Sequence, residues 1–452
     1  MSVRAVPCVD VGSTFTKGVL VDPATGALLA TASAPTTSSI DVLEGLDAVV
    51  DALTASAGAG GVDVGLPLVC SSAGGGLRVA VVGYERQVTA EAGRRVALSA
   101  GGKVVHVAAG RLDGSALAAL AAAAPDLVLL VGGTDGGNAE VLRHNAARLS
   151  QTRMAAPIVV AGNSDARAEV GEVLASTGGR HVLADNVVPR IGVIAPGSAR
   201  AAIRRVFLEH VIGGKGLSQG PRFAQLVQAP TPDAVLRGVE VLAEVAGQDV
   251  LVVDVGGATT DVYSVITPEG EDAALRKEVV APLWHARTVE ADLGLRWSAP
   301  GVVEAAEAEG LPLTPTLASY AGWLASHPAH LPGGASEAEL DRELARLAAL
   351  VAVRRHGRPE SAGGAPRPLA AVGLVLGSGG QLRHDAEHAT GPGGVLDVLL
   401  GDHAGGWPVP RHTQSAVDTA YLLFAVGLLA DPHPEAARAL ATGLGDGVTL
   451  RT

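Results

Sequence analysis

The sequence predicts an α/β protein whose strands and helices pack in layers. Hydrophobic residues make up 48% of the 452 residues and aromatic residues only 3%, so Val, Leu and Ala must fill the cores, as they do in α/β layers. A pattern of apolar run, acidic glycine turn and second apolar run occurs twice, at residues 10–17 (DVGSTFTK) and 254–261 (DVGGATTD). The chain is too long for one simple core, which indicates two to four domains or subdomains.

The composition argues against two classes of partner. Thirty-four basic and 46 acidic side chains give a net charge of −12, so neither a nucleic-acid surface nor an anionic-membrane surface is expected. Cys8 and Cys70 each lie in an apolar run, which indicates two buried thiols in a reducing cytoplasm. No signal-peptide region precedes the first strand, and the longest apolar tracts, 116–131 and 421–430, are interrupted or too short to span a bilayer. We expect a soluble, cytoplasmic protein.

The two acidic turns have the composition of phosphate-binding turns. Their glycines let the backbone turn tightly and bring amide hydrogens near a phosphate, and their hydroxyls add donors. The leading carboxylate of each turn can hold a magnesium ion or its water. Two such turns facing each other would clamp the phosphates of a nucleotide. A single turn of this kind more commonly joins an ordinary hairpin, so it is the pairing that favours phosphate binding.

The elements before residue 140 place two further glycine loops at strand ends. We expect strands at 3–10, 18–22, 27–34, 66–70 and 126–131, and helices at 42–55 and 116–124. The loop at 71–76 (SSAGGG) lies where open α/β sheets bind ligands, although a plain glycine turn explains it equally well. The loop at 132–138 (GGTDGGN) carries Asp135, which could do chemistry or could bond the backbone of its own loop.

The remaining elements predict an α/β insertion, a second acidic turn and a helical insertion. We expect a helix from residue 140, strands at 157–161, 181–183, 248–253, 262–266 and 369–376, and helices at 166–176, 199–212, 234–244, 300–352 and 413–429. Charged residues gather at 287–296 (RTVEADLGLR), where they could orient a ligand or partner or form a solvated, salt-bridged turn. Residues 358–368 have the composition of an exposed linker. Small residues at 377–380 (GSGG) would let a nucleoside lie against the backbone.

Three glycine loops at strand ends, in the order phosphate, phosphate and nucleoside, resemble those of the actin, sugar-kinase and Hsp70 superfamily of ATPases. More narrowly, the chain is similar to the glutamate mutase L (MutL/GlmL) family, which is unrelated to the mismatch-repair protein of similar name. The matching segments span nearly the whole chain and begin at Asp10 (DVGSTFTK), Ser71 (SSAGGGLR), Gly132 (GGTDGGN), Pro196 (PGSAR), Lys215 (KGLS), Asp254 (DVGGATTD), Arg287 (RTVEADLGLR) and Gly377 (GSGG).

The resemblance implies duplicated, ribonuclease H-like α/β halves around a cleft that binds ATP and Mg²⁺. The first half would be residues 1–245 with an α/β insertion at about 140–215, and the second would be 246–452 with a helical insertion at about 300–355. Phosphate contacts would come from Gly12, Ser13, Thr14, Lys17, Gly256, Gly257 and Thr259, and nucleoside contacts from Gly377, Gly379 and Gly380. Asp10 and Asp254 would position magnesium and the attacking water, and Asp135 is a further candidate for positioning water.

The family resemblance further implies an ATP-dependent accessory protein for an adenosylcobalamin-dependent mutase, glutamate mutase or a related aminomutase. Such a protein would loosen the mutase so that damaged cobalamin exchanges for intact coenzyme. Two alternatives stay open. A small-molecule kinase acting on a sugar or carboxylate would use the same fold, and a nucleotide-gated scaffold would bind ATP without hydrolysing it.

Three other motifs match known sites only in spacing. Residues 384–388 fit HxxEH, the inverted zinc-protease signature, but we expect a solvent-facing helix there. Residues 216–220 fit GxSxG without a preceding strand, so the serine is interpreted as a loop hydroxyl. Lys103 and Lys215 each follow two glycines but lack the rest of a P-loop.

Overall fold

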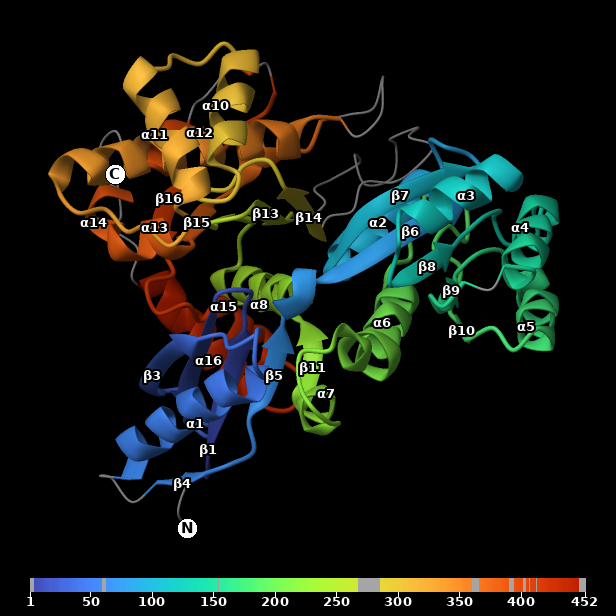
Figure 1. Cartoon of the computed structure of the whole chain (residues 1–452), viewed down its shortest axis with the longest axis horizontal. Helices are drawn as coiled ribbons and strands as arrows, with labels where there is room; N and C mark the ends of the chain where they lie inside the picture. Colours follow the sequence, from blue (N-terminus) through green and yellow to red (C-terminus); the bar gives the residue numbers. More distant parts are fainter. Residues whose placement is uncertain are drawn as a thin grey trace. The chain divides into compact units, whose positions relative to one another are not determined.

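The computed structural model describes residues 4–58, 62–152, 154–266, 285–359, 366–389, 394–400, 404–405, 407–411 and 413–446 (Figure 1). These residues form two compact units. The first contains residues 4–238 and 424–437, and the second contains the other described residues from 239 onward.

The first unit is built on a sheet with the strand order β11-β5-β1-β2-β3. Strands β1 (Arg4–Val11), β2 (Phe15–Val21) and β3 (Leu28–Pro35) are antiparallel, whereas β5 (Leu68–Ser71) and β11 (Val227–Pro230) run parallel to β1. A two-residue strand, β4 (Asp63–Val64), also pairs with β1. Helix α1 (Val42–Gly58) packs on the three antiparallel strands (Figure 1). Strand β1 is buried along nearly its whole length, which explains its continuous apolar run.

A second, all-parallel sheet of this unit has the order β10-β9-β8-β6-β7. Its strands are β6 (Leu77–Gly83), β7 (Gly102–Ala109), β8 (Leu127–Leu130), β9 (Ile158–Val160) and β10 (His181–Leu183). The helices that connect and follow them are α2 (Thr89–Ser99), α3 (Gly114–Ala122), α4 (Glu140–Ser150), α5 (Arg167–Ser176) and α6 (Gly197–Val206).

This second sheet starts at Leu77, well before the segment at 140–215 in which the sequence places an α/β insertion. Strands β6 and β7 and helix α2 were not predicted from the sequence. Only five residues separate β5 from β6, so the glycine loop at 71–76 joins the two sheets directly. The core of the unit is correspondingly continuous, because side chains of β1, β5, β6 and β8 belong to one buried cluster.

The chain returns to the first sheet through short elements. A π-helical turn, η3 (Phe207–Val211), and a 3₁₀ turn, η4 (Ile212–Lys215), continue α6, so the helix expected at 199–212 is α-helical only in its first part. Helix α7 (Arg222–Leu226) precedes β11, and α8 (Thr231–Ala246) follows it. The division between the two units falls inside α8.

The second unit repeats the topology of the first sheet. Strands β12 (Val250–Val255), β13 (Thr260–Val265) and β14 (His285–Glu290) are antiparallel, and β15 (Leu374–Ser378) and β16 (Gln414–Val417) run parallel to β12. The strand order β14-β13-β12-β15-β16 corresponds strand for strand to β3-β2-β1-β5-β11. Identical order and direction confirm the expected fold class, an α/β protein with duplicated halves.

Helices α10 (Ala299–Ala308), α11 (Pro315–Ser326) and α12 (Ala335–Gly357) form the helical insertion of the second unit (Figure 1). Its buried side chains join those of β12 and β15 in one cluster, so it shares the core of the sheet. After β15 come α13 (Gly380–His384) and α14 (Ala386–Ala389), and the described chain ends with α15 (Leu423–Leu429) and α16 (Pro434–Asp446). The remaining 3₁₀ turns are η1 (Ala73–Gly75), η2 (Ser164–Ala166), η5 (Leu369–Ala371) and η6 (Asp397–Leu399).

One predicted helix near the end of the chain is wrong, and one of the two interpretations left open for the charged segment is narrowed. The single helix expected at 413–429 is the strand β16 followed by α15, with Asp418 and Tyr421 between them. Tyr421 has a φ of 58°. The backbone N–H groups of Leu422 and Leu423 both donate to the Asp418 carboxylate, and these bonds end the strand and start α15. The charged segment at 287–296 is not a solvated turn throughout, because Arg287 lies 94% buried in β14.

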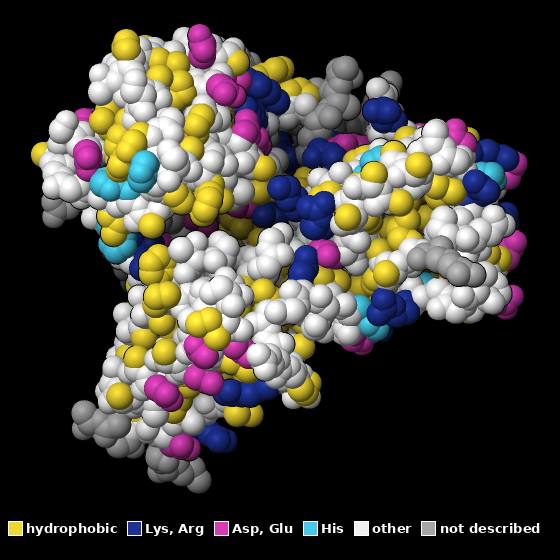
Figure 2. All heavy atoms as spheres, in the orientation of Figure 1, with side chains coloured by type: hydrophobic (Ala, Val, Ile, Leu, Met, Phe, Trp, Pro, Cys, Tyr) yellow, Lys and Arg dark blue, Asp and Glu magenta, His cyan; other side chains and the backbone are white. Residues whose placement is uncertain are grey.

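The surface of the described residues carries scattered apolar side chains, as most globular surfaces do. Figure 2 shows hydrophobic side chains at many separate points of one face, with acidic and basic side chains between them. Cys8 and Cys70 are buried and free, as expected. Every helix in the described part of the chain is too short or too polar to cross a membrane.

His356 gives the second unit a pH-dependent contact. It is fully buried on α12, and its two ring nitrogens lie 2.9 Å from the hydroxyls of Thr288 on β14 and Ser264 on β13. Burial, reinforced by Arg367, holds the pKa of His356 well below its usual value. The unfolded chain therefore binds a proton at mildly acidic pH that the folded chain excludes, and stability must fall as the pH drops below about 6.5.

We predict that His356→Gln reduces this loss of stability on acidification. Between pH 7.5 and 5.5 the wild-type free energy of unfolding should fall by about 1 kcal/mol more than that of the variant, because one proton uptake is removed. Urea unfolding at the two pH values measures the difference. His384→Gln, at an exposed histidine, is the control and should follow the wild type. Equal acid sensitivity of His356→Gln and the wild type would contradict the assignment.

Candidate functional site

The first acidic turn is a tight connection between β1 and β2. Asp10 pairs with Lys17 across the two strands, and the Gly12 N–H donates to the Phe15 carbonyl at 3.2 Å. A Cβ at Gly12 would lie 2.7 Å from that carbonyl oxygen, so the turn requires glycine. Ser13 and Thr14 at its tip are exposed. Their hydroxyls are therefore available to an incoming ligand.

The second acidic turn has the same geometry between β12 and β13. Asp254 pairs with Asp261, and the Gly256 N–H donates to the Thr259 carbonyl at 2.9 Å. A Cβ at Gly256 would lie 2.9 Å from that oxygen. Gly257 is exposed at the tip. The duplication therefore extends from strand order to the hydrogen bond that closes each turn.

The Asp10 carboxylate lies in a buried polar pocket that the sequence analysis missed. Asp10 is 3% exposed, and its Oδ1 accepts hydrogen bonds from the Thr231 hydroxyl at the start of α8 and from the Cys70 thiol at 3.6 Å. Burial, and next the charge of Asp10, raise the pKa of Cys70 well above its usual value, so the thiol stays neutral and donates. Cys70 is the residue of β5 that pairs with Asp10, a relation that only the sheet order reveals.

The two turns differ most at the residue that faces the leading aspartate. This residue is the partly buried Lys17 in the first unit and Asp261 in the second. Asp261 accepts hydrogen bonds from the buried Arg287 at 2.8 and 2.6 Å and from the Thr259 hydroxyl at 3.2 Å. Burial alone would lower the pKa of Arg287, but the charge of Asp261 and, next, Tyr263 outweigh it, so the net pKa is raised and the guanidinium stays protonated. Only the first turn presents a cation at this position.

The third glycine loop lies directly against the second turn. Gly379 follows β15 with a φ of +98°, and a Cβ there would lie 2.1 Å from the carbonyl oxygen of Val255, the residue before Gly256. Gly377 is buried at the end of β15, and Gly380 begins α13 on the surface. The structure therefore brings this loop together with Asp254 and the second turn. In the first unit, the loop at 71–76 lies against the first turn in the same way, because the backbone N–H of Ser72 donates to the Val11 carbonyl at 3.1 Å.

Asp135 lies on the loop after β8, in the second sheet of the first unit, whereas the first acidic turn belongs to the other sheet of that unit. Its Oδ1 accepts hydrogen bonds from the Ser164 N–H at 2.9 Å and the Asn186 side chain at 2.8 Å. Burial raises the pKa of Asp135, but these bonds and Arg167 outweigh it, and the net pKa is lowered. The contacts favour the structural alternative, although Asp135 bonds two neighbouring loops and not its own backbone.

The competing motifs have ordinary structural explanations. His384 and His388 are exposed on two separate short helices, and His388 contacts Asp385 at 2.6 Å. The Ser218 hydroxyl donates to Asp41 at 3.0 Å, and Lys215 pairs with Asp126 at 2.7 Å. In the part of the chain that the structure describes, no group of three or more His, Cys, Asp or Glu side chains could hold a metal ion.

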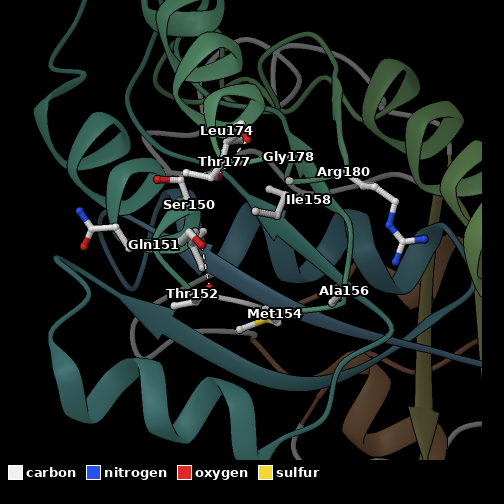
Figure 3. Close-up of a pocket in the computed structure, with 12 residues that line it drawn as sticks. Ser150, Gln151, Thr152, Met154, Ala156, Ile158, Leu174, Thr177, Gly178 and Arg180 are labelled. Carbon is white, nitrogen blue, oxygen red and sulfur yellow. Dashed lines mark hydrogen bonds between the residues drawn. The ribbon is translucent and has the colours of Figure 1, made fainter.

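A pocket of about 540 Å³ lies in the second sheet's layer of the first unit (Figure 3). Its walls are the C-terminal ends of α4 and α5 and the start of β9, the opposite end of the strands from the loop at 132–138. The Ser150 hydroxyl and those of Thr152 and Thr177, which follow the two helices, donate to carbonyls of α4 and α5. Arg180 donates to the Ala155 carbonyl at 2.7 Å. Open α/β sheets bind ligands at the carboxyl ends of strands, so this pocket is not assigned a ligand.

Residues 6–443 match the sequence profile described as MutL protein. The chain is also 34% identical over 448 residues to the Protein MutL of Clostridium tetanomorphum, covering 95% of this chain and 96% of that protein. The chain belongs to the MutL family. The match covers both acidic turns, the third glycine loop and the charged segment at 287–296.

Solved structures resemble this MutL family chain only distantly. An acetone carboxylase in its nucleotide-free form is 13% identical, with a TM-score of 0.40, and the match covers 94% of this chain and 70% of that one. The activator of 2-hydroxyisocaproyl-CoA dehydratase from Clostridium difficile, with bound ADPNP, is 10% identical with a TM-score of 0.32, covering 99% and 100%. The ROK hexokinase of Thermus thermophilus is 13% identical with a TM-score of 0.29, covering 98% and 100%. Likenesses at this level say nothing about activity.

We predict that Gly379→Ala damages the packing of the third glycine loop on the second turn while Gly443→Ala, on the surface of α16, does not. The first change places a methyl group 2.1 Å from the Val255 carbonyl at a backbone angle that alanine avoids, whereas a Cβ at Gly443 meets nothing within 4 Å. For the nucleotide binding that is proposed below, Gly379→Ala should weaken the affinity by about tenfold or more, since the loop and the second turn cannot both keep their places. Isothermal titration calorimetry on the two variants measures the difference, and equal affinities would contradict the packing argument.

Proposed function

We propose that this MutL family chain is an ATP-dependent reactivating protein for an adenosylcobalamin-dependent mutase, either glutamate mutase or a related aminomutase. The observation that carries the proposal is the pair of acidic turns with one register and one closing hydrogen bond on two copies of the same sheet. Membership of the MutL family supports the choice of a mutase as the partner.

In the proposal, both turns bind the phosphates of one ATP molecule. The residues assigned to the phosphates are Gly12, Ser13, Thr14 and Lys17 in the first unit and Gly256, Gly257 and Thr259 in the second. Gly377, Gly379 and Gly380 would hold the nucleoside. Lys17, the cation of the first turn, would offset the negative charge of the phosphates. Asp261, at the matching position of the second turn, is itself negative and cannot do so. Asp135 remains a proposed group for positioning water, although its hydrogen bonds to Ser164 and Asn186 favour a structural role.

The leading carboxylates suit magnesium only when a nucleotide is present. Magnesium keeps several waters and takes one or two carboxylates together with substrate phosphates, which matches a single aspartate per turn. The described residues around Asp10 offer a thiol and a hydroxyl that donate hydrogen bonds and hold the carboxylate in place. Asp10 and Asp254 would thus hold a nucleotide-bound magnesium ion through its water, and the ion would neutralise charge on the phosphates.

Coupling to a mutase requires two states of the ATPase with different affinities for it. ATP can shift the equilibrium between these two states only by as much as its affinities for them differ. Contacts to the γ-phosphate exist before hydrolysis and are lost after it, so a change in the turns can change the affinity for the mutase. In the proposal, the ATP-bound state loosens the mutase enough for damaged cobalamin to leave.

Recovery of an inactivated mutase is the direct test. Incubating the protein with inactivated glutamate mutase, ATP, magnesium and fresh coenzyme should restore mutase activity, and omitting ATP should prevent recovery. Replacing ATP with a non-hydrolysable analogue distinguishes hydrolysis from binding alone. Transfer of phosphate to a sugar or carboxylate without any recovery would overturn the proposal in favour of the kinase.

We predict that Asp10→Asn and Asp254→Asn each abolish magnesium-dependent ATP turnover. The amide keeps the shape of the side chain, and at Asp10 it keeps an acceptor for the Thr231 hydroxyl, but it removes the charge that would hold magnesium. The expected loss is about 100-fold or more. Asp63→Asn is the control, because this exposed aspartate of β4 pairs only loosely with Arg4 at 3.5 Å. Survival of turnover in both variants would place the site elsewhere.

A further inference from the structure

The last part of the charged segment at 287–296, which the proposed function leaves unused, lies against the second acidic turn. Residues 293–298, here called the brace, bond the carbonyls of three consecutive turn residues. The N–H groups of Leu295 and Arg296 donate to Gly256 at 3.0 Å and Gly257 at 2.8 Å. The Ser298 hydroxyl donates to the Ala258 carbonyl at 2.9 Å.

The contact between brace and turn leaves no room for adjustment. A Cβ at Gly294 would lie 2.3 Å from the carbonyl carbon of Ala258, so the brace can only approach this closely with glycine at that position. Each carbonyl held by the brace is directed at a protein donor. The negative ends of these peptide groups are thereby kept on the side of the brace, which favours an anion on the amide side of the turn.

The side chain of Arg296 anchors the brace to the helical insertion. Its guanidinium pairs with both oxygens of Asp341 on α12, at 2.7 and 3.3 Å, and donates to the His330 carbonyl at 3.0 Å. Asp341 is 2% exposed, and it also accepts from the Tyr320 hydroxyl of α11 at 3.0 Å. A buried carboxylate that bonds both an arginine fork and a phenol is strongly oriented, and removing one partner leaves part of its hydrogen-bonding capacity unsatisfied.

An exposed indole lies at the far end of this chain of contacts. Trp323 of α11 stacks on the ring of Tyr320 at 6.3 Å and on that of His327 at 4.4 Å, and it is 41% exposed. It also meets the ring of His330 edge-on at 4.7 Å. Residues 310–336 around it contain no Asp, Glu, Lys or Arg. A continuous path of hydrogen bonds and ring contacts therefore runs from the turn to the surface of the insertion.

We propose that Arg296 is a positioning residue for the second acidic turn and that, through Asp341 and Tyr320, it couples occupancy of the turn to the helical insertion. The inference rests on the proposed function, because it takes a nucleotide as the ligand of the turn. Ligand binding that fixes the turn also fixes the brace, since three turn carbonyls share its donors. The brace in turn fixes Asp341, and with it the contact between α11 and α12. The helical insertion thereby becomes the part of the second unit that reports the nucleotide.

Three variants of the full chain test the coupling. Arg296→Ala removes the anchor, Tyr320→Phe removes only one hydroxyl from the same carboxylate, and Glu339→Gln is the matched control. Glu339 lies on α12 two residues from Asp341, is 53% exposed in its side chain and pairs at the surface with Arg342 and Arg346. Because Tyr320→Phe keeps the ring that packs in the core, it remains informative should Arg296→Ala fold poorly.

Nucleotide affinity and hydrogen exchange give the two readouts. A non-hydrolysable ATP analogue with magnesium should slow amide exchange in the turn, the brace, α11 and the first part of α12 of the wild type. Arg296→Ala should weaken the affinity for the analogue by about tenfold, and the analogue should then slow amide exchange only in the turn. Tyr320→Phe should keep wild-type thermal stability within a few degrees yet lose protection of α11, a result that a merely structural role would not give. Glu339→Gln should match the wild type.

The outcomes separate this inference from the proposed function. If the wild type binds no adenine nucleotide, the proposed function fails and the coupling fails with it. If the wild type binds the analogue but Arg296→Ala and Tyr320→Phe keep its affinity and the protection of α11, the coupling alone is overturned.

Discussion

Both halves of this protein depend on a steric constraint in a four-residue turn. Gly12 and Gly256 each donate an N–H to the carbonyl three residues on, and a side chain at either position would meet that same oxygen at 2.7 or 2.9 Å. Because the hydrogen bond and the absence of Cβ enforce each other, the turn has one shape. That shape fixes the register of the strands, so each leading aspartate stands opposite a defined partner at the end of a buried strand.

The same turn carries a different electrostatic environment in each half. In the first, Asp10 is buried with a neutral thiol and a hydroxyl, and Lys17 supplies the positive charge across the hairpin. In the second, Asp261 replaces the lysine and is neutralised by the buried Arg287. Duplication thus preserved the backbone while the charges diverged.

Much of the fold was predictable because its signals are local. Strands β1, β2, β12 and β13 each contain a short apolar run, and the glycine turns between them are short and distinctive. The elements that were missed or misread lack such signals. Strand β6 directly follows the glycine loop at 71–76, so its apolar residues were not recognised as a separate strand. Strand β16 has only four residues and precedes a longer helix, so it was included in that helix. Strand β14 carries charge in a buried position, which only its pairing with Asp261 on the neighbouring strand makes tolerable.

The sequence by itself determined the chemistry of the candidate site: two acidic glycine turns, a third glycine loop and the family to which they belong. Tertiary structure alone decided which side chains surround those turns. Cys70 and Thr231 reach Asp10, and Arg296 reaches Asp341, across separations of tens to hundreds of residues. The physical reason is that local patterns fix backbone conformation, whereas hydrogen bonds between distant segments depend on strand order and on burial, which no local pattern encodes.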